Sequence, residues 1–517
     1  MIRISNIKID VLSDNKETII KKLEKELKEK VIDYKIVKKS IDARKDIKYV
    51  YTFDVTVNNE EKVLRNKNVI KTPIEEYKLE ITGTIPVTKR PIIVGTGPSG
   101  LFLGYMLSKY GYKPLLIERG EKIEDRVKTV EKFWQDNNLN TESNVQFGEG
   151  GAGTFSDGKL NTLVKDKFFR MKKVFEIFVE CGAPEEIMYS YKPHIGTDKL
   201  RDIVINLRNK IIDMGGEFRY NTKLTDLIIK DNKLTGIVVN NLEEIETDTL
   251  FLALGHSARD TYEVLQEKGL DMKSKPFAVG VRIEHSQEDI NKCLYKDYYD
   301  KLGPASYKLT YNTETGRGVY SFCMCPGGYV VNASSEKDRL AVNGMSNYDR
   351  ESGIANSALV VSVTPKDYGE DLFDGVKFQR ELEEKAYKLG NGLIPIQKYK
   401  DFVNNKISSD FTNINSKGSV TSANLNDLLP DYISESIKEA MPEFKKHISC
   451  FDEGILLGIE SRTSSPITIL RDDNGESNIK GIYPVGEGAG YSGGITTSAM
   501  DALKQVENFV KKYKNML

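Results

Sequence analysis

Hydrophobic and polar residues follow two periods along residues 1–83. Residues 3–11 alternate apolar and polar side chains, as a half-buried strand does, and residues 17–31 carry an apolar stripe on one helical face. The same criteria predict strands at 34–40, 49–57 and 77–83 and a short helix at 60–66. The order β-α-β-β-α-β predicts a small ferredoxin-like domain over residues 1–88, with a linker at 84–90.

After residue 90 the strands become short and wholly apolar, as in a parallel sheet covered on both faces. Residues 92–94 run directly into Gly95, Gly97 and Gly100, which are spaced as Gly-x-Gly-x-x-Gly. A helix that is apolar nearly all round follows, and a second strand ends at Glu118. This succession is typical of a dinucleotide-binding βαβ unit.

Each part of this unit has a physical task. Gly95 permits the tight turn out of the strand, Gly97 lets a pyrophosphate approach the backbone, and Gly100 lets the helix pack close to the sheet. The helix N-terminus offers free N–H groups to the phosphates. Glu118 is placed to accept hydrogen bonds from ribose hydroxyls, which favours FAD or NAD over NADP.

The later pattern predicts that this domain is interrupted. Strands at 215–222 and 249–254 enclose a hairpin at 224–239, whereas residues from 276 to 445 mix strands with amphipathic helices. A buried strand at 481–487 and a closing helix at 496–513 restore the first pattern. We therefore predict an α/β protein with three parts: the N-terminal domain, a discontinuous Rossmann-like FAD-binding domain over 89–275 and 446–517, and an inserted mixed α+β cap domain over 276–445.

Composition restricts the classes of function. The 517 residues are 39% hydrophobic and 29% charged with a net charge of −1, which gives no general case for binding nucleic acid or an anionic membrane. No apolar run approaches the roughly 20 residues of a membrane span, and the first residues lack the apolar core of a signal peptide. Five thinly spread cysteines favour reduced thiols and a cytoplasmic location.

The N-terminal region is more basic than the remainder. Residues 1–90 carry 21 Lys and Arg against 15 Asp and Glu. A module that docks RNA or a protein would have this balance, and so would a solvated surface, which the interleaved signs favour. A nucleic-acid partner is therefore not expected, but would bind through residues 1–88. The best candidates for a contact surface are Lys38, Lys39, Arg44 and Lys45.

A second glycine-rich stretch at 147–160 repeats the spacing of the first without its context. No buried strand precedes it and no apolar helix follows it. Its bare backbone and hydroxyl groups suit the wrapping of a flavin and its phosphates, and an ordinary glycine-rich loop is the alternative. A helix expected at 119–136 carries Arg126 beside this stretch.

The glycine turn with Glu118, the strand end at 252–255 and the strand at 482–487 together resemble the glutathione-reductase-like flavoproteins with two dinucleotide-binding domains. In that superfamily the last motif usually ends in Gly-Asp, whereas here it is Gly486-Glu487, which keeps the acceptor on a longer arm. More closely, the chain resembles a bacterial family known only as FAD-dependent dehydrogenases or FAD-binding proteins of unknown substrate. This resemblance covers nearly the whole chain and implies non-covalent FAD, but hardly any chemistry.

The resemblance also implies that the closing helix aims its N-terminus at the pyrimidine edge of the flavin, where its dipole stabilises negative charge. The complete set of predicted FAD contacts is Gly95, Gly97, Pro98, Ser99, Gly100, Glu118, Arg119, Arg126, Gly150, Gly151, Thr154, Ser156, Lys159, Leu224, Leu254, Gly255, Gly486, Glu487, Gly493, Gly494 and Ile495.

Two cysteines and one histidine are candidates for the reaction. Cys323 and Cys325 could form a labile disulfide before a Pro-Gly-Gly turn, although two small buried residues on a strand is the favoured alternative. His256 follows the return strand, where the superfamily approaches the flavin; a histidine that caps the next helix is an equal alternative. No metal site is expected, because no spacing of Cys and His completes four ligands.

Two arginines are candidates for binding a substrate anion. Arg282 could hold a carboxylate bidentately, unless it pairs with Glu284 on the same face of its strand. Arg462 lies among small hydroxyl residues just before the segment that closes the FAD site, and a pair with Glu460 is its alternative.

These observations predict an FAD-dependent oxidoreductase that moves a hydride between flavin N5 and a small, anionic or unsaturated substrate. A second nucleotide fingerprint and the Cys-x4-Cys pair of flavoprotein disulfide reductases are absent from the sequence, so NAD(P)H is expected at most as a transient donor. A protein or the substrate itself could also supply electrons. The alternatives are an RNA-modifying flavoprotein that docks through residues 1–88 and a non-enzymatic redox sensor that uses Cys323 and Cys325.

Overall fold

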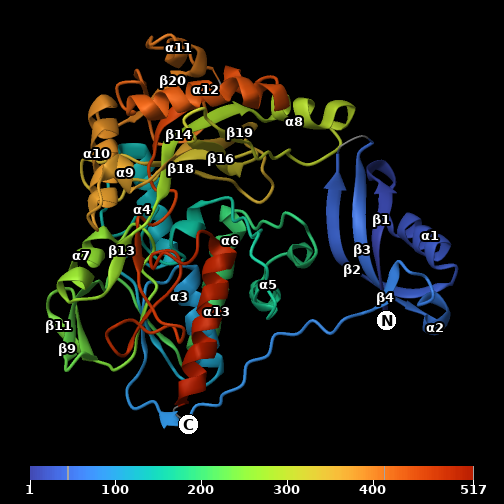
Figure 1. Ribbon diagram of the computed structural model, residues 1–517, viewed down its shortest axis with the longest axis horizontal. Helices are drawn as coiled ribbons and strands as arrows, with labels where there is room; N and C mark the ends of the chain where they lie inside the picture. Colours follow the sequence, from blue (N-terminus) through green and yellow to red (C-terminus); the bar gives the residue numbers. More distant parts are fainter. Residues whose placement is uncertain (44–45, 413, 516–517) are drawn as a thin grey trace.

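A computed structural model describes residues 1–43, 46–412 and 414–515 (Figure 1). The N-terminal sheet stands beside the rest of the molecule and is joined to it by an extended segment that passes close to the C-terminus. Sheets and helices alternate through the remainder of the chain, which confirms the α/β class. No helix in the described part of the chain has both the length and the apolarity needed to cross a membrane.

The N-terminal domain is an antiparallel sheet of order β2-β3-β1-β4. Apolar side chains of alternate strand positions meet Ile19, Leu23 and Leu27 of helix α1 in a core of its own. The elements are β1 (Ile2–Asp10), α1 (Lys16–Leu27), β2 (Val31–Asp42), β3 (Lys48–Val57), α2 (Glu60–Val63) and β4 (Val69–Lys71).

The last strand of this domain was predicted at 77–83, and that prediction is wrong. The fourth strand is β4, and residues 72–84 form no strand. Instead, Tyr77 and Leu79 pack against the core of the following domain, and the N–H groups of Thr82 and Gly83 donate to the carbonyl of Val510. The alternating pattern of this segment therefore reflects an extended strap that docks on another domain. Strand β5 (Ile85–Pro86) continues it and pairs with β26 (Tyr513–Lys514).

The predicted basic contact surface is partly engaged within the molecule. The backbone of Lys39 pairs with residues Tyr189 and Tyr191 of the next domain, and its ammonium lies 2.8 Å from Asp14. Arg44 and Lys45 lie outside the described residues.

The second domain is built on a five-stranded parallel sheet of order β25-β12-β6-β7-β8. Alternate residues of the same strand enter different cores: Ile93 faces the helices α3, α5, α6 and α13, whereas Ile92 and Val94 face the opposite layer with the β9–β11 meander and α7. This burial on both faces explains why the strands are wholly apolar. The elements are β6 (Ile92–Val94), α3 (Pro98–Lys109), β7 (Leu115–Ile117), α4 (Ile123–Asp136), α5 (Arg170–Glu180), α6 (Thr197–Asp213), β8 (Glu217–Arg219), β9 (Leu224–Lys230), β10 (Lys233–Val239), β11 (Glu243–Glu246), β12 (Leu250–Leu252), α7 (Arg259–Glu267), β25 (Ile482–Pro484) and α13 (Ile495–Lys512).

The inserted cap is built on a seven-stranded sheet of order β15-β16-β19-β14-β23-β20-β22, which helices α10 and α12 accompany (Figure 1). Strand β23 (Ile455–Glu460) pairs with both β14 and β20 inside this sheet. The cap therefore continues beyond the predicted boundary at residue 445. The main elements are β14 (Phe277–Ser286), α8 (Gln287–Tyr295), β15 (Thr310–Asn312), β16 (Gly318–Cys325), β17 (Tyr329–Asn332), β18 (Val342–Met345), β19 (Ile354–Val363), α10 (Asp374–Leu389), β20 (Ile394–Lys398), β22 (Val420–Ser422) and α12 (Asp431–His447).

Candidate functional site

A cavity of about 520 Å³ lies where the carboxyl ends of the parallel strands meet the cap. Its wall includes the turn after β6, the second glycine loop, the ends of β12 and β25, and the cap strand β16. Open parallel sheets bind their ligands at this edge, because the loops that leave the strands are free to form a crevice there.

The glycines of the first motif are required by close backbone contacts. Gly95 has φ +97°, and a Cβ at this position would lie 2.3 Å from the carbonyl oxygen of Ala253. A Cβ at Gly100 would lie 1.8 Å from the carbonyl oxygen of Gly95. At Gly97 a Cβ would meet only the Cα of Gly151, at 3.7 Å, so the fold itself tolerates a methyl group there. Gly97 caps helix α3 without a side chain, which leaves the helix N-terminus open toward the cavity.

Glu118 ends strand β7 and lines the cavity, although it is only 5% exposed. One carboxylate oxygen accepts hydrogen bonds from the backbone N–H and the hydroxyl of Thr96, both at 2.9 Å. The other accepts from the N–H groups of Gly120 and Gly148, both at 3.0 Å. The acid therefore fixes the glycine turn against the second glycine loop as well as presenting a carboxylate at the cavity.

The second glycine loop is held by Arg126, which does not reach the cavity. Arg126 was predicted to contact the cofactor, but in the structure its guanidinium is fully buried and donates to five backbone carbonyls. Burial lowers the pKa of this guanidinium to about 10. The carbonyls belong to Asn144, Val145, Gly148, Glu149 and Gly151, at 2.7–3.2 Å.

Arg119 lines the cavity, but its charge is already matched. Its guanidinium binds both carboxylate oxygens of Asp260 at 3.0 Å and also Glu142, and it stacks on the ring of Phe147 at 3.9 Å. Burial alone would raise the pKa of Asp260, but Arg119 and Lys223 outweigh burial and hold that pKa well below its usual range. Arg119 therefore offers the cavity a flat, neutralised surface.

His256 and Glu487 face each other at the ends of β12 and β25. His256 Nδ1 lies 3.3 Å from Glu487 Oε1, and both residues line the cavity. The second ring nitrogen of His256, Nε2, is buried without a hydrogen-bond partner in the described chain. An unpaired nitrogen at a cavity wall is a candidate contact for a bound ligand.

The N-terminus of α13 also opens at the cavity. A Cβ at Gly493 would meet no atom within 4 Å, and Gly493, Gly494 and Ile495 all line the wall. Gly486 does not line the cavity wall. Its N–H donates to Asp501 at 2.8 Å, and a Cβ there would lie 2.0 Å from Ser99 Oγ.

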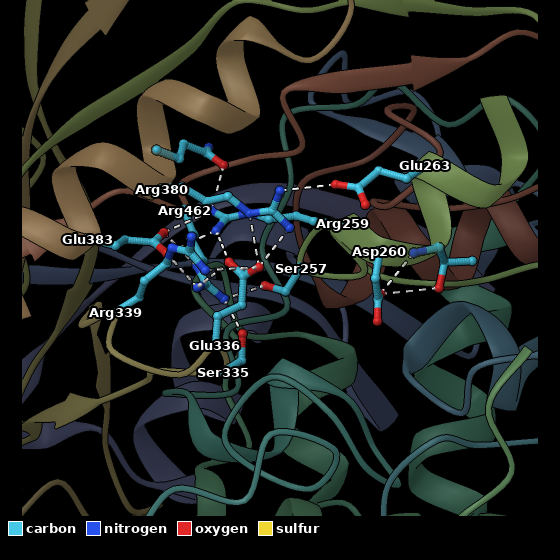
Figure 2. Close-up of polar contacts among 12 residues, drawn as sticks. Ser257, Arg259, Asp260, Glu263, Ser335, Glu336, Arg339, Arg380, Glu383 and Arg462 are labelled. Atoms are coloured by element: carbon cyan, nitrogen blue, oxygen red, sulfur yellow. Dashed lines mark hydrogen bonds and ion pairs between the residues drawn. The ribbon is translucent and has the colours of Figure 1, made fainter. Parts of the chain in front are cut away.

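Arg462 lies in a buried ionic cluster that joins the two large domains (Figure 2). Its guanidinium holds both oxygens of Glu383 at 2.7–2.8 Å, and Arg259 holds the same carboxylate at 2.8–2.9 Å. The alternative pair with Glu460 does not form, because Glu460 pairs with Arg282. Arg462 lines the cavity, but its charge is shared with Glu383 and with Glu336 at 3.9 Å.

Arg282 was predicted to bind substrate, but it lies inside the cap and does not line the cavity. It is fully buried, and it donates to Glu460 at 3.1 Å, to Asn356 at 3.0 Å and to the carbonyl of Cys323 at 2.7 Å. The alternative pair with Glu284 does not form either. Burial raises the pKa of Glu460 to about 7 despite this arginine.

Cys323 and Cys325 lie at a β-bulge of strand β16, where the pairing with β19 shifts between Phe322 and Cys325. Cys323 has φ +44° and lines the cavity, whereas Cys325 is fully buried behind it.

Residues 276–463 match the family model of FAD-dependent protein, C-terminal domain-like. Residues 1–56 match a domain of unknown function (DUF8436). An uncharacterized protein of Clostridium beijerinckii is 45% identical over 531 residues, which span 99% of each chain. This chain belongs to the same family.

Among solved structures, an E. coli quinol fumarate reductase mutant is 11% identical, covering 83% of this chain and 71% of its own, with a TM-score of 0.37. An oxidoreductase from Methanosarcina mazei is 12% identical, covering 81% and 100%, with a TM-score of 0.36. At that distance neither protein informs the reaction of this family member.

The cavity brings together most of the predicted site residues of this family member. Those that line it are His256, Arg462, Cys323, Gly95, Gly97, Pro98, Ser99, Glu118, Arg119, Gly151, Ser156, Lys159, Leu224, Leu254, Gly255, Glu487, Gly493, Gly494 and Ile495. Those that do not are Arg282, Cys325, Gly100, Arg126, Gly150, Thr154 and Gly486. Gly100, Gly150 and Thr154 lie behind the wall and shape its backbone.

Sequence reasoning missed the polar residues of the cap side. Asp157, Lys192 and Arg350 line the cavity, and Arg350 binds both oxygens of Asp157 at 2.6 and 3.0 Å. It also missed Glu383, although Gln379 and Glu383 share the apolar face of helix α10 at a spacing of four. An acid at that position could have indicated a buried partner.

Proposed function

We propose that this protein is an FAD-dependent oxidoreductase that transfers a hydride between flavin N5 and a small anionic substrate in the cavity. The observation that carries the proposal is the open glycine turn with Glu118 at the carboxyl edge of the parallel sheet. The family match of residues 276–463 to FAD-dependent proteins supports it.

The residues of the cavity fit the parts of FAD. Gly97 and the N-terminus of α3 suit the pyrophosphate, and Glu118 suits the ribose of the adenosine. The N-terminus of α13, open at Gly493, suits the pyrimidine edge of the flavin. When bound, the flavin would supply the hydride chemistry. The chain would supply orientation, exclusion of water by the cap, and a proton site at the His256–Glu487 pair.

The substitution Gly97→Ala tests the cofactor site without a predicted cost to the fold. The methyl group fits in the chain but projects where a pyrophosphate must approach. We expect FAD affinity to fall about tenfold or more, equivalent to about 1.4 kcal/mol, while the melting temperature of the apoprotein stays unchanged. Gly303→Ala is the matched control, since a Cβ there meets no atom within 4 Å. Equal FAD affinity of both variants would contradict the assignment.

The reaction class is tested by mixing the purified protein anaerobically with NADH or NADPH and following flavin absorbance near ~450 nm. Fast bleaching by one nicotinamide would identify it as donor. Absence of bleaching would assign electron supply to a protein or to the substrate itself. A colourless protein that takes up no FAD would overturn the proposed function.

A further inference from the structure

Two thiols of the cap wall have opposite surroundings. The bulge in β16 turns Cys323 to the cavity and leaves Cys325 fully buried two residues later. The Cys325 thiol donates to the carbonyl of Cys323 at 3.3 Å, and Arg282 Nη2 lies 3.8 Å from Cys325 Sγ. The strand therefore presents one accessible thiol and keeps a second one directly behind it.

The accessible thiol shares the cavity wall with a buried lysine ammonium. Lys159 Nζ is buried at the cavity wall and has no hydrogen-bond partner in the described chain. The nearest carboxylate, Asp157, lies 3.7 Å away and is already held bidentately by Arg350. The neighbouring Cys325 thiol, with Lys159 and Arg282, lowers the pKa of Cys323, whereas the Cys323 thiol and burial raise the pKa of Cys325. Asp157 and Glu460 are the acids close to the Cys323 thiol.

The same end of the cavity is rich in cations. Lys192 and Lys308 line it and are exposed, and Lys192 Nζ donates to the Ser306 hydroxyl at 3.0 Å. A ligand that enters here gains if it carries negative charge.

We propose that Cys323 and Cys325 form a dithiol that exchanges with an anionic disulfide entering from the cationic end of the cavity. The Cys323 thiolate supplies an electron pair to one substrate sulfur, and the substrate S–S bond breaks with its pair on the leaving thiolate. Cys325 gives its proton to solvent water and then attacks Cys323 Sγ, which forms the Cys323–Cys325 disulfide and releases the second substrate thiolate. A low-pKa accessible thiol before a buried partner is the arrangement this sequence of steps requires.

The exchange itself needs no flavin. Reduction of the Cys323–Cys325 disulfide back to two thiols takes up two electrons and two protons and therefore needs a reductant. The reduced flavin is that reductant, so only this step rests on the proposed function. Thiol exchange in a protein whose flavin cannot be reduced would support the dithiol and count against the oxidoreductase. A reducible flavin beside unreactive thiols would support the oxidoreductase and count against the dithiol.

The test uses 5,5′-dithiobis(2-nitrobenzoate), a dianionic disulfide, at pH 7 on the full-length protein as purified. Cys293→Ser and Cys450→Ser are built into every sample, because these two sulfurs lie 3.6 Å apart and would react on their own. Burial raises the pKa of the remaining Cys181 to about 11, which keeps it unreactive. We expect two thiolates released per chain, one after Cys325→Ser with a stable mixed disulfide at Cys323, and none after Cys323→Ser.

The charge preference is tested with 2,2′-dithiodipyridine, a neutral disulfide. Lys159→Met should slow the reaction of Cys323 with the dianionic probe about tenfold more than with the neutral one. Lys230→Met, on the exposed end of β9, is the control and should change neither rate. Two thiolates released after Cys325→Ser, an unreactive Cys323, or equal slowing of both probes would overturn the proposal.

Discussion

Two of the predicted site residues that do not line the cavity are buried arginines. Arg126 and Arg282 are fully buried and direct their guanidiniums at the protein itself. Sequence shows an arginine near a glycine loop or on a strand, and such a residue is a reasonable anion ligand. The partners that neutralise it lie far along the chain, as Glu460 does for Arg282, and single-sequence patterns do not reveal them.

Arg126→Lys is expected to loosen the second glycine loop. A lysine ammonium has three donors and no planar fork, so several of the five buried carbonyls that Arg126 serves would lose their partner. Each unsatisfied buried group costs about 1–3 kcal/mol, so the free energy of unfolding should fall by about 3 kcal/mol or more. Urea unfolding measures this, and flavin content per chain should fall with it.

Arg219→Lys provides the comparison for that variant, because Arg219 pairs with Glu243 at the surface of β8. It should leave both unfolding and flavin content nearly unchanged. If Arg126→Lys also left unfolding and flavin content unchanged, the hydrogen bonds from Arg126 to the five carbonyls would not be what holds the second glycine loop.

At the scale of elements, one carboxylate of helix α10 contacts both α7 and the segment just after β23. Glu383 is fully buried between the guanidiniums of Arg259 and Arg462 (Figure 2). Burial alone would raise the pKa of Glu383, but the two arginines outweigh burial and hold that pKa well below its usual range. The ion cluster therefore fixes the cap against the cofactor domain.

Glu383→Gln should remove that attachment and change the pH dependence of stability. A neutral amide leaves two buried guanidiniums short of charge, which costs about 3–5 kcal/mol at pH 7. Because the folded pKa lies below the unfolded value of about 4.3, the carboxylate's contribution is complete above that value and is lost as pH falls. The stability gap between wild type and variant, measured by urea unfolding, should thus narrow below about pH 4.

The neighbouring variant Glu384→Gln serves as control, because Glu384 is exposed and pairs only with Lys388 one turn on. It should match wild type across the pH range. A gap between wild type and Glu383→Gln that stayed constant down to pH 2 would show that the ion cluster does not titrate as inferred.

Elements whose neighbours are close in sequence could be predicted, and elements that join distant segments could not. The βαβ unit at β6, α3 and β7 was recognisable because apolar strands, glycine turn and acid follow one another directly. Strand β23 has the apolar pattern of any buried strand, so the sequence analysis placed it in the cofactor domain. In the structure it pairs with β14 and β20 in the cap sheet. The segment 77–83 alternates like a strand because its apolar residues dock on another domain.

For the whole molecule, that extended strap is the main covalent and packing link between the N-terminal sheet and the cofactor domain. Tyr77 and Leu79 contact the large core, and β5 pairs with the C-terminal β26. The N-terminal sheet has its own core and touches the next domain through the backbone of Lys39. Stability of the cofactor domain should therefore depend on the strap and little on the sheet.

Two truncations separate these contributions. A chain of residues 72–517 keeps the strap and should bind FAD and unfold in urea as the full-length cofactor domain does. A chain of residues 89–517 loses the packing of Tyr77 and Leu79 and the β5–β26 pairing, so its free energy of unfolding should fall by about 2 kcal/mol or more. Identical unfolding of the two chains would mean that the strap only tethers. A loss already present in the longer chain would instead assign the stabilising role to the sheet and its contact with Tyr189 and Tyr191, next to the cavity residue Lys192.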